Sequence, residues 1–140
     1  MEPQSGQPTL VIDGTPWLPL RSDYPDLNVE AQMRYQRSVW SFYRDLLRLR
    51  RESPALRRGS FQRLSLPSHR GLAYLRATGE QQAIVALNFV NAPLRLAIAS
   101  ARPPLEWPLA LAAHPDRPAR FLREAIELGP FQAAIFIHSP

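Results

Sequence analysis

The sequence of 140 residues contains no cysteine and no lysine. The absence of cysteine excludes disulfide bonds, thiol chemistry and cysteine-ligated zinc sites. The three histidines, His69, His114 and His138, have no ligand spacing between them, so we expect neither a metal site nor a cofactor. No hydrophobic run approaches the roughly 20 residues of a membrane span, and the first residues lack the regions of a signal peptide. We therefore expect a cytoplasmic protein that has no membrane partner.

All positively charged side chains at neutral pH are arginines. Seventeen arginines against 12 acidic residues give a net charge of +5, which is compatible with nucleic-acid binding. However, the chain is also rich in alanine, leucine and proline, the other residues that GC-rich codons favour. The densest arginine cluster, within residues 44–58, coincides with the end of a predicted helix, where cations complement the helix dipole. We therefore predict no nucleic-acid partner.

The length and composition are those of one folded domain. Hydrophobic residues make up 45% and charged residues 21% of the chain, close to globular averages. The chain is too short for a complete (β/α)8 barrel, which needs about 200 residues or more.

The first part of the chain divides into a loop and one helix. Residues 1–36 contain five prolines and little periodicity, which predicts an extended loop. Helical spacing of apolar residues then predicts a helix over residues 36–52, which Pro54 ends. The stretch 54–59 is predicted to be a turn, in which Gly59 is free to take a positive φ.

From residue 60 onward the apolar pattern changes to short runs with period two. The segment 119–128 fits either a helix or a strand, and the neighbouring strands favour a strand. The predicted class is therefore α+β and mainly β, with an N-terminal loop and one long helix followed by a small antiparallel β-sandwich. The predicted strands cover residues 60–66, 71–77, 83–90, 94–99, 109–114, 119–128 and 131–138.

Three strings in a fixed order resemble glycoside hydrolase family 13. They are TPWLPLRSDYPDLNVEAQ (15–32), SVWSFYRDLLRLRRESPALRRGSF (38–61) and IVALNFVNAPLRL (84–96). The first two are similar to the end of the catalytic barrel in the α-glucosidase, oligo-1,6-glucosidase and trehalose synthase branch, and the third resembles the β domain that follows it. The resemblance implies three parts: 1–36, the loop before the last barrel helix; 37–58, that helix and a turn; and 59–140, the β-sandwich called domain C.

The resemblance also implies where the chemistry lies. Retaining glycosidases of this family need a nucleophilic aspartate and a general-acid glutamate, which barrel strands carry upstream of the matched segment. None of the 12 acidic residues here stands in such a context, so we assign no catalytic residue. We expect the C-terminal accessory and stabilising domain of a bacterial α-glucosidase-like enzyme, inactive by itself. The alternatives are a free-standing module that binds an α-glucan or oligosaccharide, and a subunit that completes a separately encoded barrel.

Three acidic residues and three tryptophans are candidates for a functional site. Asp23, Asp26 and Glu30 are the candidate acids, but their turn-rich surroundings favour turn and capping roles. Of the tryptophans, Trp17 and Trp40 are expected to pack, and Trp107 is the candidate for an exposed surface on which a sugar ring stacks.

The predicted helix carries an apolar stripe that would face the barrel wall in the family. In the absence of that wall, such a stripe indicates an interface. We expect the chain to self-associate or to bind a catalytic barrel fragment through it. The residues of this predicted interface are Val39, Phe42, Tyr43, Leu46, Leu47 and Leu49.

Overall fold

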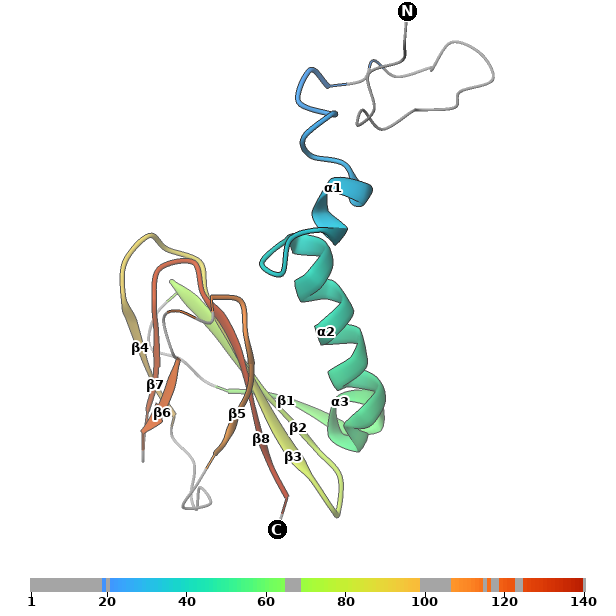
Figure 1. The fold of residues 1–140 in the computed structure, drawn as a ribbon. Coiled ribbons are helices and arrows are strands. Elements are labelled where there is room, and N and C mark those ends of the chain that lie inside the picture. Colours follow the sequence, from blue (N-terminus) through green and yellow to red (C-terminus); the bar gives the residue numbers. More distant parts are fainter. Residues whose placement is uncertain are drawn as a thin grey trace, which may run out of the picture. The chain divides into compact units, whose positions relative to one another are not determined.

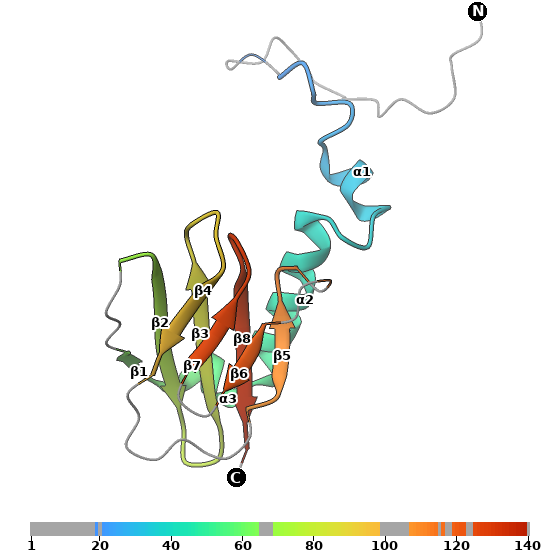
Figure 2. The same cartoon turned by 90° about the vertical axis from the view of Figure 1, so that its left-hand side faces the viewer.

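The computed structural model describes residues 19, 21–64, 69–98, 107–114, 116, 119–122 and 125–139. Within these ranges the chain is mostly β-structure in antiparallel sheets, with a few helices (Figures 1 and 2). The predicted class, α+β and mainly β with antiparallel strands, is thus confirmed. The chain divides into two compact units, Met1–Asp45 and Leu46–Pro140.

The first unit contains a short helix, α1 (Val29–Met33), inside the segment that was predicted to be loop. Asn28 explains the difference, because it has extended backbone angles and its side chain accepts a hydrogen bond of 2.8 Å from the Ala31 N–H. The same amide donates to the carbonyls of Tyr24 and Pro25 at 3.1 and 2.8 Å. One capping side chain thus fixes both the turn and the helix that follows it.

The long helix α2 (Val39–Glu52) agrees with the prediction except for its start. The Ser41 N–H donates to the Ser38 Oγ at 3.1 Å, so that Ser38 satisfies one of the free donors at the helix start. The buried Ser41 hydroxyl donates to the Tyr35 carbonyl at 2.7 Å. The helix therefore begins at Val39, three residues later than predicted.

A second short helix, α3 (Pro54–Arg58), replaces the predicted turn. Pro54 ends α2 as predicted, but it also opens α3, because a proline is tolerated in the first helical turn and Ser53 caps it. Gly59, which follows, has a φ of −64° and not a positive φ. A Cβ there would meet the Ala55 carbonyl and lie 2.9 Å from the Ala77 nitrogen, so this glycine permits close approach of α3 to the sheet.

The second unit contains two antiparallel sheets. One has the strand order β1-β2-β3-β8-β5 and the other has the order β4-β7-β6. The strands are β1 (Ser60–Arg63), β2 (Gly71–Ala77), β3 (Gln82–Asn88), β4 (Leu94–Ala97), β5 (Leu109–Ala112), β6 (Arg120–Leu122), β7 (Ala125–Leu128) and β8 (Ala133–His138).

The prediction of a single strand over residues 119–128 was wrong. The segment forms two strands, β6 and β7, that pair with each other. Phe121 lies opposite Ile126 and Arg120 opposite Glu127 in this pair. The apolar residues that suggested one long strand are instead partners across two short ones.

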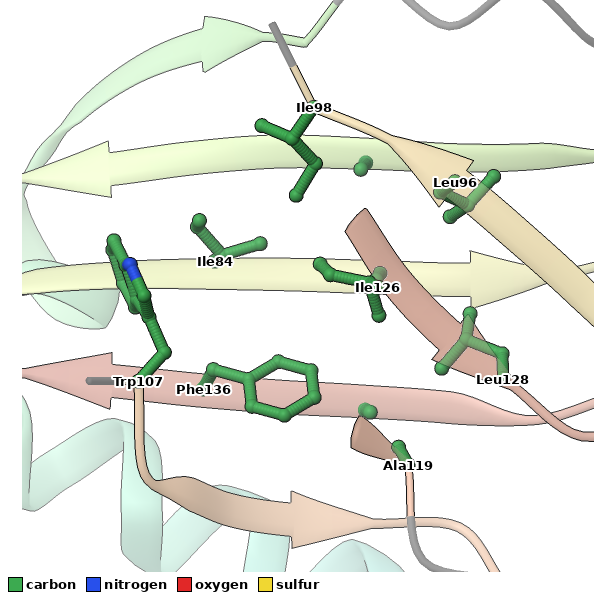
Figure 3. Packing of buried hydrophobic residues seen from close by; sticks show 11 residues of the cluster. Ile84, Leu96, Ile98, Trp107, Ala119, Ile126, Leu128 and Phe136 are labelled. Atoms are coloured by element: carbon green, nitrogen blue, oxygen red, sulfur yellow. The ribbon is translucent and has the colours of Figure 1, made fainter. Parts of the chain in front are cut away.

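The two sheets pack against each other through one hydrophobic core (Figure 3). The five-stranded sheet contributes Ile84 from β3 and Phe136 from β8, and the three-stranded sheet contributes Leu96 and Ile126. Figure 3 shows these side chains meeting between the strands, together with Trp107. We call this the inter-sheet core; its buried members are Ala73, Ile84, Ala86, Leu96, Ile98, Trp107, Ala119, Ile126, Leu128, Ala134 and Phe136.

The opposite face of the five-stranded sheet is covered by helix. Because side chains alternate along a strand, Ala83 and Val85 of β3 point away from the inter-sheet core. They form a second cluster with Ile135 of β8 and with Ala55 and Leu56 of α3, and we call this cluster the helix-side core. Leu46 and Leu49 of α2 pack against it. For this reason the compact unit begins at Leu46, whereas the predicted β domain begins at residue 59.

A pair of leucine variants tests the helix-side core. Leu56→Ala removes a buried side chain and should lower the free energy of unfolding by about 2–5 kcal/mol. Leu47→Ala, in which the leucine is exposed, should change it by about 0.5 kcal/mol or less. Urea denaturation of both variants measures the difference. Equal losses would show that α3 does not belong to the core of the sheet unit.

Candidate functional site

Asp23, the first candidate acid, is held as a carboxylate. Its two oxygens accept hydrogen bonds of 2.9 and 2.6 Å from Nε and Nη2 of Arg21. The hydrogen bond from Arg21 lowers the pKa of Asp23 below its usual value. A general acid in a glycosidase needs a raised pKa. The hydrogen bond from Arg21 therefore lowers the pKa of Asp23, whereas general-acid catalysis requires a raised pKa.

The other two candidate acids have local structural roles. Glu30 accepts a hydrogen bond of 2.7 Å from Arg34 one helical turn further on, across α1. The Asp26 N–H donates to the Asp23 carbonyl at 3.1 Å, as part of the turn before α1. Gln32 connects this segment to the long helix, because its side-chain oxygen accepts from the Trp40 N–H at 3.1 Å. Asp26 thus lies in a turn, and Glu30 forms an ion pair along α1, whose N-cap is Asn28.

The prediction that Trp107 is an exposed sugar platform was wrong. Trp107 is 7% exposed and belongs to the inter-sheet core. Its ring stacks on Phe121 with centroids 5.3 Å apart, and the centroid of the His138 ring lies 5.9 Å from that of Trp107. The position of Trp107 between a charged residue, Glu106, and a proline, Pro108, suggested exposure, but the sequence does not show that two sheets close over this position.

The remaining tryptophans and histidines form no site in the described residues. Trp40 is half-buried and carries the Arg44 guanidinium 5.2 Å above its ring, which suits the predicted packing role. Trp17 lies outside the described residues. His69 and His114 are exposed. Within the described part of the chain, no three His, Asp or Glu side chains gather as metal ligands, and no helix is long and apolar enough to cross a membrane.

The predicted interface on α2 separates into two groups. Phe42, Leu46 and Leu49 are half-buried, and the two leucines pack against the helix-side core. The other three residues lie at four-residue intervals, on one side of the helix, and are 53–66% exposed. We call them the exposed α2 stripe; they are Val39, Tyr43 and Leu47.

Comparison with known proteins relates this arrangement to a family. Residues 4–59 match the family model of the α-amylase catalytic domain. Trehalose-6-phosphate hydrolase of Bacillus subtilis (strain 168) is 26% identical over 123 residues, which cover 88% of this chain and 22% of that protein. An oligo-1,6-glucosidase of Parageobacillus thermoglucosidasius is 32% identical over 76 residues, covering 54% of this chain and 14% of that protein.

Solved structures agree with these matches. Isomaltulose synthase from Klebsiella sp. LX3 superimposes with a TM-score of 0.75 and 26% identity, covering 90% of this chain and 22% of that one. The chain is thus similar to part of the enzymes of the α-amylase family, glycoside hydrolase family 13. It spans about a fifth (22%) of the length of the relatives that it matches over most of its residues.

The boundary of the match to the family model differs from the boundary of the compact unit. The match to the catalytic domain ends at Gly59, one residue before β1 begins. The second compact unit begins at Leu46. The end of α2 and all of α3 thus match the catalytic-domain model and also pack with the sheets.

The sequence analysis missed two exposed aromatic residues, Phe89 and Phe131. They lie in the β3–β4 and β7–β8 connections and are 56% and 57% exposed. Both belong to runs that were predicted to be strand, 83–90 and 131–138. The dipeptide Gly129-Pro130 before Phe131 is a turn signal that places it outside the strand.

The ion pair of Asp23 gives a prediction about its titration. Arg21→Gln removes the guanidinium that favours the ionised form, so the pKa of Asp23 should rise toward the usual value of about 4. In the native chain, the stabilisation from this pair is present above the unfolded-state pKa and is lost as the pH falls through the lowered folded-state pKa. NMR titration of the Asp23 carboxyl carbon in both chains measures the shift. An unchanged pKa in the variant would contradict the assigned cause.

Proposed function

We propose that the chain is the C-terminal accessory and stabilising part of an α-glucosidase-like enzyme of the α-amylase family. In this proposal α2 is the last helix of the catalytic barrel, and the two sheets are the β-sandwich of an α-amylase-type C-terminal domain. The observation that carries it is the position of the match: the catalytic-domain similarity stops at Gly59, directly before β1, while the similarity to a whole relative covers 88% of the chain. The curated relatives named above are bacterial, which supports a bacterial protein; its cytoplasmic location stays a prediction.

These 140 residues supply no glycosidase chemistry of their own in this proposal. Hydrolysis with retention needs two carboxyl groups about 5–5.5 Å apart, one of them with a raised pKa. The three candidate acids of the first unit are engaged differently: Asp23 with Arg21, Glu30 with Arg34, and Asp26 in a turn. The parental activity toward α-glucosidic bonds therefore depends on residues other than these.

An activity assay tests this part of the proposal. The purified 140-residue chain should release no p-nitrophenol from p-nitrophenyl α-glucoside above the buffer rate. The matched control is the same preparation of Asp23→Asn, which should give the same background. Turnover that copurifies with the chain and falls in Asp23→Asn would contradict the proposal.

The exposed α2 stripe is the surface that we propose for docking to the rest of a catalytic domain. One side of α2 is occupied by the sheet unit through Leu46 and Leu49, whereas Val39, Tyr43 and Leu47 remain more than half exposed. Fully burying one side chain of this kind contributes roughly 1.5–3 kcal/mol. Three such residues, spaced four apart on one side of the helix, therefore favour association. An apolar stripe of this kind suits an apolar partner surface. In the absence of that partner, we expect the stripe to pair with a second copy of the chain.

Charge introduced into the stripe should prevent this association. The double variant Tyr43→Glu/Leu47→Glu places two carboxylates in the interface and should remain monomeric, with the β-sheet circular dichroism unchanged. Gln36→Glu, which adds the same residue at an exposed position outside the stripe, should associate as the native chain does. Sedimentation velocity over a concentration series measures all three. A native chain that stays monomeric at high micromolar concentration would contradict the docking surface.

A further inference from the structure

Strand β1 forms one edge of the five-stranded sheet, and all four of its residues are exposed. Figure 2 shows it beside β2, with which it pairs in a continuous antiparallel register. The strand at the other edge, β5, is interrupted by a register shift between Leu109 and Leu111. Of the two edges of this sheet, β1 is therefore the one with a regular backbone.

The outer edge of β1 presents backbone groups that the sheet leaves free. The Leu64 N–H donates to the Ala73 carbonyl at 2.9 Å, so alternate residues of β1 turn their N–H and C=O groups toward β2. Phe61 and Arg63 lie between these positions and turn theirs outward. No described residue bonds to these outward groups. An unpaired strand edge of this kind is a template for a further strand.

Beside this edge, one face of the sheet offers an apolar contact and a charged contact. The centroid of the Phe61 ring is 5.1 Å from that of the Tyr74 ring in β2, so the two rings lie together on one face. Arg63 lies directly opposite Tyr74, and residues opposite each other in a sheet share a face. Phe61 is 65% exposed, and Arg63 is also exposed. A strand added to this edge would therefore contact a phenyl ring and, two residues further on, a guanidinium group.

The sequence around β1 carries positive charge and no negative charge. Residues 54–77, from the start of α3 to the end of β2, contain five arginines and no aspartate or glutamate. The Arg76 guanidinium donates to the Gly59 carbonyl, directly before β1, at 2.8 Å. Such a potential attracts an acidic partner. Three exposed arginines of this segment form no ion pair with a described residue; they are Arg57, Arg58 and Arg63.

The same charge opposes pairing of β1 with a second copy of the chain. Two β1 strands side by side would bring the arginines of both copies together, and like charges across a strand pair are destabilising. A nucleic acid would match the charge, but it has no amide backbone that continues a β-ladder. An open ladder together with positive charge therefore indicates a polypeptide partner that carries acidic residues.

We propose that the outer edge of β1 binds an extended acidic segment of another protein, which joins the five-stranded sheet as an antiparallel strand. In this mode of recognition, main-chain hydrogen bonds give affinity and alternate side chains give specificity. An apolar residue opposite Phe61 packs on the rings of Phe61 and Tyr74, and an acidic residue opposite Arg63 forms an ion pair. Because alternate residues of a strand share a face, the recognised pattern is acidic–x–apolar in the direction of the bound chain.

The probe is the peptide acetyl-Thr-Glu-Thr-Val-Thr-Glu-Thr-amide, titrated into the full 140-residue chain. With its valine opposite Phe61, one glutamate falls opposite Arg63 and the other beside Gly59, to which Arg76 donates. Replacing both glutamates by glutamine should weaken binding by about fivefold, the loss expected for two exposed ion pairs. N-methylation of the valine nitrogen removes the donor that the Phe61 carbonyl would accept and should abolish saturable binding.

NMR spectroscopy of the amides of β1 distinguishes strand addition from contact through side chains alone. The signals of residues 60–63 should shift and saturate with the acidic peptide. Hydrogen exchange should slow at the amides of Phe61 and Arg63, which turn outward, and change little at Gln62, whose N–H turns toward β2.

Charge reversal in the chain provides a matched pair of variants. Arg63→Glu should weaken binding of the acidic peptide by about tenfold, because it replaces an attraction by a repulsion. Arg51→Glu makes the same change at an exposed arginine of α2 and should bind like the native chain. Circular dichroism of both variants should match that of the native chain.

Four results would overturn the proposal. The first is the absence of a saturable shift at residues 60–63, and the second is equal affinity for the glutamate and glutamine peptides. The third is protection of the Phe61 and Arg63 amides that rises with chain concentration without peptide, which would show that a second copy covers the edge. The fourth is an equal shift of these signals by a ten-residue oligothymidylate, which would show that the surface recognises charge alone.

Discussion

The second unit depends on a five-stranded sheet that is apolar on both faces. In β3, Ile84 and Ala86 face the inter-sheet core, while Ala83 and Val85 face the helix-side core. Both faces must be covered, because an open face would leave a row of apolar side chains in water. The three-stranded sheet covers one face, and α3 with the second half of α2 covers the other. The second half of α2 and all of α3 are therefore part of the sheet unit and not an attachment to it.

The need to cover this sheet face divides α2 into a part that packs and a part that is exposed. Its second half completes the helix-side core through Leu46 and Leu49, whereas the exposed α2 stripe is available to another surface. The second half of this helix lies both within the match to the catalytic-domain model and within the compact unit of the sheets.

Most of the fold could be predicted from the sequence where local pattern and tertiary packing agree. The strand over 71–77 and the end of α2 before Pro54 follow from periodicity and proline chemistry alone. Trp107 could not be predicted, because its burial depends on two sheets meeting over it and not on its neighbours in sequence. The exposure of Phe131 could not be predicted for a similar reason: the sequence pattern makes it part of an apolar strand, and only the structure shows its positive φ and its exposure.

Hydrogen exchange along α2 tests most directly whether the helix is built into the sheet unit. Amides 50–53 bond to carbonyls in the half of α2 that packs on the sheet, as in the 2.9 Å bond from the Ser53 N–H to the Leu49 carbonyl. They should exchange as slowly as the amides of β3, since both open only when the shared core opens. Amides 42–45 should exchange faster. If both halves of α2 exchange equally fast while β3 stays protected, the helix does not belong to the sheet unit and the account is wrong.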